Sequence, residues 1–91
     1  MKPCVYILTN SSNSVLYVEV TSDLQQRILQ HQNGQGSEFT VRYNLRKLIF
    51  CEYHPTMMSA IEREKQLKSW SRSRKVALIE LSNPKWQELS L

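Results

Sequence analysis

The chain has 91 residues, of which 41% are hydrophobic and 22% are charged, an ordinary balance for a globular protein. Only 2 glycines and 3 prolines are present, which excludes a collagen, a flexible linker protein and a Pro-rich adaptor. The formal net charge of +4 is a mild basic excess that permits an anionic partner. At this length we expect a single domain over residues 1–91 with one core.

The first strand is predicted over residues 4–8, which are rich in β-branched and aromatic side chains. A polar turn cluster at 9–14 and a second such run at 15–20 then predict an antiparallel hairpin. Alternation along the second strand separates a mixed face from an aliphatic face, and we expect the aliphatic one to meet the core. The mixed face carries Val15, Tyr17 and Glu19, and the aliphatic face carries Leu16, Val18 and Val20.

A helix is expected next, because Ser22 and Gln25 have the spacing of a capping box. It should run to about residue 33 and end at Gly34, followed by a polar loop over 34–43. A third strand is predicted over 45–53.

The remaining sequence predicts two helices. Thr56 can cap a helix that runs to about residue 70, and another runs from about 72 to 82, before Asn83-Pro84. The expected fold class is α+β, with the order β-β-α-β-α-α. Its three-stranded antiparallel sheet would be flanked by helices packed against one face.

Glu64 is a candidate site residue because of its position on the predicted helix after Thr56. At about 100° per residue, it falls in the middle of the stripe formed by Met57, Ala60, Ile61 and Leu67. A carboxylate in an apolar stripe costs several kcal/mol unless it is paired, protonated or bound to a metal. A buried ion pair is the structural interpretation, and a metal ligand or an acid/base group is the functional one.

The preceding helix places His31 inside its apolar arc and Arg27 at the edge of that arc. His31 is either a core residue, or it acts with Arg27, one turn away, in holding a phosphate. Tyr6 and Tyr17 lie on the paired strands, where a tyrosine is commonly just a good strand former.

The basic residues are concentrated between positions 63 and 75, with a smaller group around Tyr43. Some of them fall in the first turn of the last helix, where the helix dipole disfavours cations, so an anionic ligand is indicated. A solvated charged face is the structural alternative, and Trp70 is either a core residue or a base-stacking one. The expected nucleic-acid-binding residues are Arg42, Arg46, Lys47, Lys68, Arg72, Arg74 and Lys75.

No run of the sequence approaches the roughly 18 apolar residues of a membrane span, and the apolar stretch after Cys4 is too short for a secretion signal. We therefore expect a cytoplasmic protein without a membrane partner. Cys4 and Cys51 lack the spacing of a metal site, so two reduced, buried thiols are expected.

Several of these residues, in their order along the chain, resemble the GIY-YIG nuclease superfamily. They are Val5-Tyr6-Ile7, Tyr17-Val18-Glu19, Arg27, His31 and Glu64. Other segments look like its small stand-alone bacterial members, namely Leu8-Thr9-Asn10, Val20-Thr21-Ser22-Asp23-Leu24, Phe39-Thr40, Tyr43-Asn44, Arg63-Glu64-Lys65-Gln66-Leu67-Lys68, Trp70 and Asn83-Pro84-Lys85-Trp86. The similarity covers nearly the whole chain and implies a three-stranded antiparallel sheet flanked by helices.

The resemblance implies hydrolysis of a phosphodiester bond in DNA or RNA with one divalent cation, Mg²⁺ or Mn²⁺. It implies that Glu64 is the metal ligand and that Arg27 stabilises the phosphate. Tyr6 would be the general base or would position the water, and Tyr17 and His31 would assist by hydrogen bonds. A protein partner or a homodimer is expected to supply specificity, because no separate recognition module is present. The alternatives are a non-enzymatic nucleic-acid-binding module of the same fold and a protein-interaction domain.

The chain departs from the family pattern at two glycine positions. Val5 replaces the first glycine, and Glu19 replaces the glycine that ends the second tripeptide. Glu19 could repel the substrate phosphate, pair with Arg27 or add a metal ligand, and each outcome would alter activity. We therefore expect Glu19, together with Asn83, to modulate the site.

Overall fold

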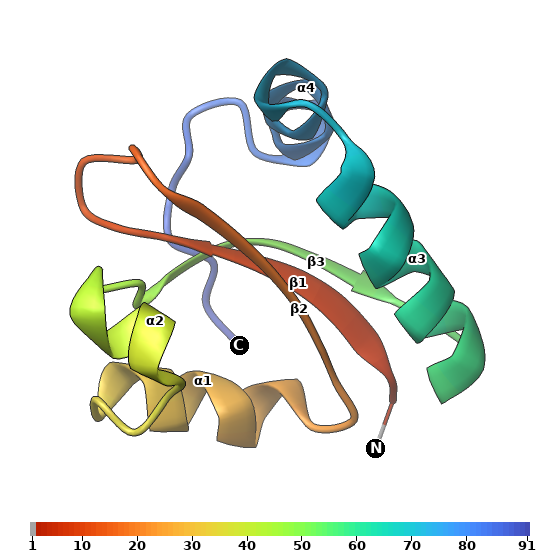
Figure 1. Ribbon diagram of the computed structural model, residues 1–91, viewed down its shortest axis with the longest axis horizontal. Coiled ribbons are helices and arrows are strands. Elements are labelled where there is room, and N and C mark those ends of the chain that lie inside the picture. The colour runs from red at the N-terminus through yellow and green to blue at the C-terminus, as the bar shows by residue number, and fades with distance from the viewer. Residues whose placement is uncertain (1) are drawn as a thin grey trace.

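The computed structural model describes residues 2–91 of the chain and confirms the predicted α+β fold, with one additional helix. Figure 1 shows a sheet with helices on either side of it. The elements in chain order are β1 (Cys4–Thr9), β2 (Leu16–Thr21), α1 (Leu24–Gln32), α2 (Glu38–Arg42), β3 (Lys47–Tyr53), α3 (Met57–Ser69) and α4 (Arg72–Ser82).

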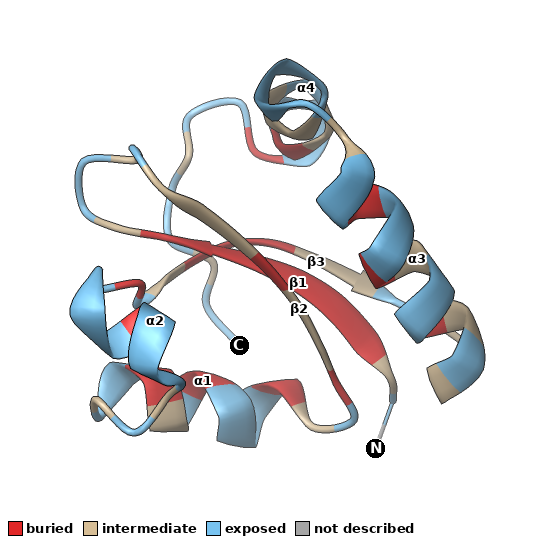
Figure 2. Ribbon diagram, in the orientation of Figure 1, coloured by how far each residue is buried: buried red, intermediate tan, exposed pale blue. Residues whose placement is uncertain are grey.

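The sheet is antiparallel throughout and has the strand order β2-β1-β3. Every residue of the central strand β1 is buried, as Figure 2 shows in red. A strand that is covered on both faces needs apolar residues at successive positions, which explains its unbroken apolar run. In the register, Tyr6 lies opposite Glu19 of β2 on one side and opposite Cys51 of β3 on the other.

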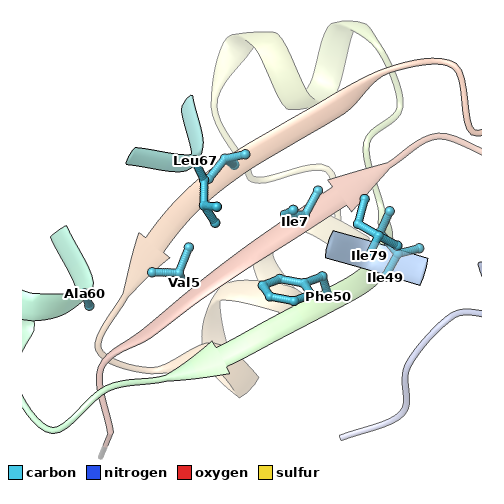
Figure 3. Close-up of a cluster of buried hydrophobic side chains, with 8 residues drawn as sticks. Val5, Ile7, Ile49, Phe50, Ala60, Leu67 and Ile79 are labelled. Carbon is cyan, nitrogen blue, oxygen red and sulfur yellow. The ribbon is translucent and has the colours of Figure 1, made fainter. Parts of the chain in front are cut away.

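Both faces of the sheet are covered, so the prediction that the helices pack against one face is wrong. Helices α3 and α4 cover one face, and α1 and α2 cover the other (Figure 1). The core on the α3 side consists of Val5, Ile7, Val18, Ile49, Phe50, Ala60, Leu67 and Ile79 (Figure 3). The core on the α1 side consists of Cys4, Tyr6, Leu8, Leu24, Ile28, Leu45 and Leu48.

The second core also corrects the expectation for β2. Val15 and Tyr17 pack against the core on the α1 side, while Leu16 and Val20 pack against the core on the α3 side. The mixed face of this strand is therefore covered as well as the aliphatic one. The aliphatic pattern identified one buried face correctly but did not reveal the second.

Side-chain caps fix where the helices begin. Asp23, not Ser22, caps α1, because its Oδ1 accepts a hydrogen bond from the Gln26 amide at 3.2 Å. Thr21 holds this turn in place, since its hydroxyl oxygen accepts from the Asp23 amide at 3.1 Å. The predicted cap at Thr56 is confirmed, with its hydroxyl accepting from the Ser59 amide at 3.1 Å.

The segment predicted as a polar loop at 34–43 contains the short helix α2. Ser37 caps it by accepting a hydrogen bond from the Thr40 amide at 3.3 Å, and Thr40 is the buried residue of the helix. Five residues are too few for an apolar period to emerge from the sequence, so the loop prediction was wrong here. Figure 2 shows α2 largely exposed.

Two polar side chains fasten α4 to the sheet. The Arg72 guanidinium donates to the carbonyl oxygens of Ser14 at 3.0 Å and Asn13 at 2.9 Å, in the β1–β2 turn. The buried Asn83 amide donates to the carbonyl oxygens of Ile49 at 3.1 Å and Gln87 at 2.8 Å. Both contacts hold helix and sheet together, and the expected roles of Arg72 in nucleic-acid binding and of Asn83 at the site stay predictions.

The two cysteines are free thiols, and Cys4 is buried as expected. Cys51 is only half-buried, which differs from the expectation. Within residues 2–91 no helix is both long and apolar enough to cross a bilayer.

Candidate active site

The candidate site lies along β2, at the edge of the sheet between the two helical layers. Tyr6 comes from the central strand, and Tyr17 and Glu19 come from β2. Helix α1 contributes Arg27 and His31, and α3 contributes Glu64 from the opposite face of the sheet. Edge strand β2 can meet side chains from both layers because no further strand covers it.

Tyr6 and His31 form a buried pair on the α1 side. The Tyr6 hydroxyl lies 3.1 Å from His31 Nε2, and the two ring centroids are 6.1 Å apart. Burial raises the pKa of Tyr6, and the negative charge of Glu19 adds to the effect. A general base has to lose its proton near neutral pH, so the expected role of Tyr6 as a general base is not supported. A protonated phenol remains suited to holding a water or a neighbouring ring by a hydrogen bond.

His31 is a buried core residue that positions Tyr6. Burial, assisted by the positive charge of Arg27, lowers the pKa of His31, so the ring is neutral at pH 7. Its other nitrogen, Nδ1, has no hydrogen-bond partner in the part of the chain that the structure describes. A Cβ added at Gly36 would come within 2.4 Å of this nitrogen, so the site requires glycine there.

Glu19 connects the Tyr17 phenol with Glu64. The Tyr17 hydroxyl donates to Glu19 Oε2 at 2.7 Å, and the Val20 amide donates to Glu19 Oε1 at 3.1 Å. A hydrogen bond joins the carboxyl groups of Glu19 and Glu64. Burial opposes the ionisation of Glu19, but the hydrogen bonds from Tyr17 and Glu64 outweigh it and lower its pKa. The two neighbouring carboxyl groups thus have pKa values shifted in opposite directions, with that of Glu19 lowered and that of Glu64 raised.

Glu64 is buried, as its place in the apolar stripe predicts. Burial, together with the hydrogen bond to Glu19, raises its pKa. Lys68, one turn along α3, lies 3.4 Å from Glu64 Oε2 and is itself half exposed. The buried ion pair that the sequence allowed is therefore not formed, because the cation that faces Glu64 comes from the same helix and lies at the surface. The positive charge of Lys68 also lowers the pKa of Glu19, so one half-exposed lysine serves both carboxyl groups.

The Arg27 side chain is exposed, and its guanidinium makes no hydrogen bond or ion pair with any residue from 2 to 91. Its positive charge lowers the pKa of Tyr6, Tyr17 and His31, although burial dominates each of them. The alternative in which Glu19 pairs with Arg27 is therefore wrong, because Glu19 is engaged by Tyr17 instead. The guanidinium is left available for an anionic ligand.

Two carboxylates are the donor set that the site offers to a metal ion. In the described residues, no three His, Cys, Asp or Glu side chains form a metal-holding group. Mg²⁺ binds oxygen ligands and is commonly held by one or two carboxylates, with waters and substrate phosphates completing its shell. Glu64, with Glu19 beside it, fits that donor chemistry.

The predicted nucleic-acid-binding residues divide into four groups, of which three line hollows at the surface. Lys68 and Lys75 line one hollow of about 250 Å³ next to Tyr17, and Arg42 lines another of about 190 Å³. Arg46 and Lys47 line a hollow of about 490 Å³ at the other end of the sheet.

Arg72 and Arg74 make contacts within the protein. Arg72 bonds the β1–β2 turn, and the Arg74 guanidinium lies 4.2 Å from the centre of the Trp70 ring. Arg63 lies near the same ring at 5.2 Å. Trp70 packs against the core on the α3 side, which supports the core interpretation of this residue.

Two aromatic residues next to the site had no assigned role in the sequence interpretation. Phe39 of α2 stacks on Tyr17 with a centroid distance of 5.8 Å and an interplanar angle of 23°. Tyr43 follows at 4.7 Å from Phe39. The signal in the sequence was the spacing of these two aromatics, four residues apart, which places them on the same side of a helical turn.

Comparison with known proteins identifies the family. The sequence model described as the GIY-YIG catalytic domain matches residues 2–77. The chain belongs to the GIY-YIG family. A UPF0213 protein of Staphylococcus saprophyticus is 35% identical over 78 residues, which cover 86% of this chain and 94% of that protein. A UPF0213 protein of Haloquadratum walsbyi is 34% identical and covers 84% of each chain.

A solved structure supports the same assignment of fold. The solution NMR structure of a UPF0213 protein from Bacillus halodurans matches with a TM-score of 0.61 and 28% sequence identity. The match covers 97% of this chain and 93% of that one. The GIY-YIG resemblance and the fold expected from it are confirmed.

Proposed function

We propose that this GIY-YIG protein binds nucleic acid and hydrolyses its phosphodiester bonds with a divalent metal ion held by Glu64, at a rate that Glu19 reduces. The observation that carries the proposal is the buried Glu64 carboxyl group, which lies close enough to Glu19 for each to shift the pKa of the other. Burying a carboxyl group next to another one costs stability, and a cation ligand gives such an arrangement a use.

Each side chain of the site has a distinct part in this proposal. Arg27 binds the phosphate and stabilises the negative charge that develops during hydrolysis. Tyr17 donates a hydrogen bond, at present to Glu19. Tyr6 is protonated and orients a water or the substrate, and His31 holds Tyr6 in place. When bound, Mg²⁺ or Mn²⁺ would polarise the phosphoryl group.

Glu19 opposes this chemistry because of its charge and its place. Its carboxylate lies between the Tyr17 hydroxyl and Glu64, where a phosphate would approach. At roughly 4–6 Å from a phosphate, a carboxylate opposes binding by about 1–4 kcal/mol. The wild-type protein is therefore expected to cleave slowly.

The first prediction is that Glu19→Gly raises the cleavage rate. Removing about 1–4 kcal/mol of repulsion corresponds to a gain of roughly five-fold to nearly a thousand-fold. The assay uses a panel of single-stranded, duplex and branched DNA and RNA, with Mg²⁺ and with EDTA. Rates are expressed per folded molecule, because glycine inside a strand costs about 0.5–1 kcal/mol of stability.

Two further variants identify the cause of any change. Glu19→Gln removes the charge but keeps the shape, so a gain there assigns the effect to repulsion. The double variant Glu19→Gly with Glu64→Ala should lose the gain, because the metal ligand is absent. A rate that falls in Glu19→Gly would contradict the repulsion and would instead make Glu19 a working metal ligand.

A second candidate function is a nucleic-acid-binding module without turnover, with specificity supplied by a protein partner or a second copy. The hydrogen bonds of Glu19 to Tyr17 and Glu64 favour it, since they occupy both groups. Binding without cleavage in wild type, Glu19→Gly and Glu19→Gln alike, on every substrate of the panel, would establish this second function.

A further inference from the structure

A row of aromatic rings runs from the buried centre of the candidate site to the surface. Its inner part is His31 and Tyr17, whose ring centroids are 6.4 Å apart in an edge-on arrangement. Phe39 stacks on Tyr17 at 5.8 Å, and Tyr43 lies 4.7 Å beyond Phe39. His31 is buried and Tyr17 is half-buried, whereas Phe39 is 45% and Tyr43 is 43% exposed.

The contacts of the exposed rings, Phe39 and Tyr43, do not explain why large aromatic residues stand at this surface. Phe39 and Tyr43 lie on and directly after the five-residue helix α2, whose buried anchor is Thr40 rather than either ring. Large apolar rings gathered at a surface commonly mark a binding site. The flat face of an aromatic ring stacks better on another aromatic ring than on an aliphatic side chain.

The surroundings of these rings are mainly basic. Phe39 borders two hollows, one lined also by Lys68 and Lys75, and the other lined also by Arg42 and Glu38. The Arg42 guanidinium lies 5.8 Å from the centre of the Tyr43 ring. Glu38 is the acidic side chain of this lining, so three cations outnumber one carboxylate.

We propose that Phe39 and Tyr43 form a stacking platform for an unpaired nucleobase of a bound DNA or RNA strand. Aromatic side chains beside a basic groove are the combination that binds single-stranded nucleic acid, because rings stack on bases and cations follow the backbone. A base in a duplex is already stacked on both faces, so the platform takes an unpaired base. Stacking on Phe39 brings the adjoining phosphate toward Tyr17 and Glu64. The inference rests on the proposed function and names its substrate class.

The test measures binding in EDTA, where cleavage does not contribute. Fluorescein-labelled oligothymidylate, oligouridylate, an abasic oligomer of equal length and a duplex are titrated at about 50 mM salt and followed by anisotropy. Wild type should bind both single strands more tightly than the abasic strand of equal charge. A strand carrying 2-aminopurine should lose fluorescence on binding, which reports base stacking without any substitution.

The variants Phe39→Leu and Tyr43→Leu keep an apolar side chain but lose the aromatic face. Each should raise the Kd for the thymidylate strand by about 5- to 150-fold and leave the Kd for the abasic strand unchanged. Tyr53→Leu is the matched control, because Tyr53 is 50% exposed and also has a cation, Lys2, 5.9 Å from its ring centre. It should bind as wild type does, and thermal melts verify that all variants are folded.

Each other outcome is decisive. If both leucine variants bind the thymidylate strand as wild type does, the platform is refuted while the proposed function stands. If wild type binds none of the four ligands, the proposed function itself fails. If the protein self-associates in sedimentation and both leucine variants abolish this without changing nucleic-acid affinity, the rings form a protein interface and the platform is refuted.

Discussion

Together with burial, Glu19 raises the pKa of two neighbouring side chains, Tyr17 and Glu64. Its carboxylate accepts the Tyr17 hydroxyl hydrogen bond, and its proximity raises the pKa of Glu64. The backbone at this position is ordinary, since the described residues with positive φ are Asn13, Asn44, Trp86 and Gly34. A glutamate is thus accommodated here without backbone strain, and its effect is electrostatic.

A divalent cation is predicted to bind at Glu64. Two neighbouring carboxyl groups repel each other once both are ionised, and a cation between them relieves this repulsion. Mn²⁺ should broaden NMR resonances of Glu64, Glu19 and Tyr17 before those elsewhere, and Mg²⁺ should shift the same set.

Two glutamate variants on α3 make this measurement specific. Glu64→Gln should abolish the effect, and Glu62→Gln, an exposed position on the same helix, should not. Spectra that stay unchanged at about 10–20 mM metal with nucleic acid present would disprove the site, since Mg²⁺ commonly needs a substrate phosphate as a further ligand.

At the level of secondary-structure elements, an ion-paired cluster fixes α3 to β3. Glu52 of β3 accepts hydrogen bonds from Arg63 Nε at 3.0 Å and lies 2.7 Å from His54 Nε2. Burial opposes the ionisation of Glu52, but these two partners outweigh it and lower its pKa. Since α3 carries Glu64, this link helps to set the position of the metal ligand.

Glu52→Gln is predicted to lower the free energy of unfolding at pH 7 by on the order of 1 kcal/mol. A carboxyl group whose pKa is lowered by folding stabilises the fold above its ordinary pKa of 4.5. That contribution is lost as the pH falls through the lower, folded pKa, so the two proteins should converge in acid. Urea unfolding between pH 3 and 7 measures this, and a difference that persists or grows toward acid pH would contradict it.

Long elements could be predicted from the sequence, and the short one could not. The strands and α1, α3 and α4 have apolar patterns several residues long, and Glu64 stood out because α3 is long enough to define a stripe. Helix α2 is shorter than two turns, so neither it nor the position of Phe39 was predictable from a period.

Contacts between elements were predictable only in part. Hydrophobic alternation cannot tell whether a second layer of helices covers the mixed face of β2, so the Tyr6–His31 pair remained hidden. The replacement of a family glycine by Glu19 was visible in the sequence. That Glu19 bonds to Tyr17 and not to Arg27 was not, because it depends on where the side chains lie at the edge of the sheet.

At the scale of the whole molecule, the net charge of +4 is unevenly distributed. Lys68, Lys75 and Arg42 lie around the aromatic rings, while Arg72 and Arg74 are engaged in contacts inside the protein. Nucleic acid would therefore meet a limited set of cations on one side of the molecule.

Binding of nucleic acid is predicted to weaken steeply with salt. If about four phosphates are contacted, log K should fall with log salt at a slope near −3 to −4, measured by anisotropy across a salt series. Lys68→Gln should reduce the slope by roughly one. A slope near zero, or no binding of any DNA or RNA at about 50 mM salt, would favour a protein-interaction domain instead.

The central position of β1 also determines the order in which the molecule can assemble. Its pairing with β2 closes a short turn, whereas its pairing with β3 joins Tyr6 to Cys51 across the whole of α1 and α2. Local contacts form before distant ones because a longer loop costs more entropy to close. We therefore expect the β1–β2 hairpin, with Tyr6, Tyr17 and Glu19 in register, to form early, and Glu64 to reach it only when α3 docks on β1 and β2. We accordingly expect an emerging chain to assemble the phenols of the site before the carboxyl group that would bind the metal.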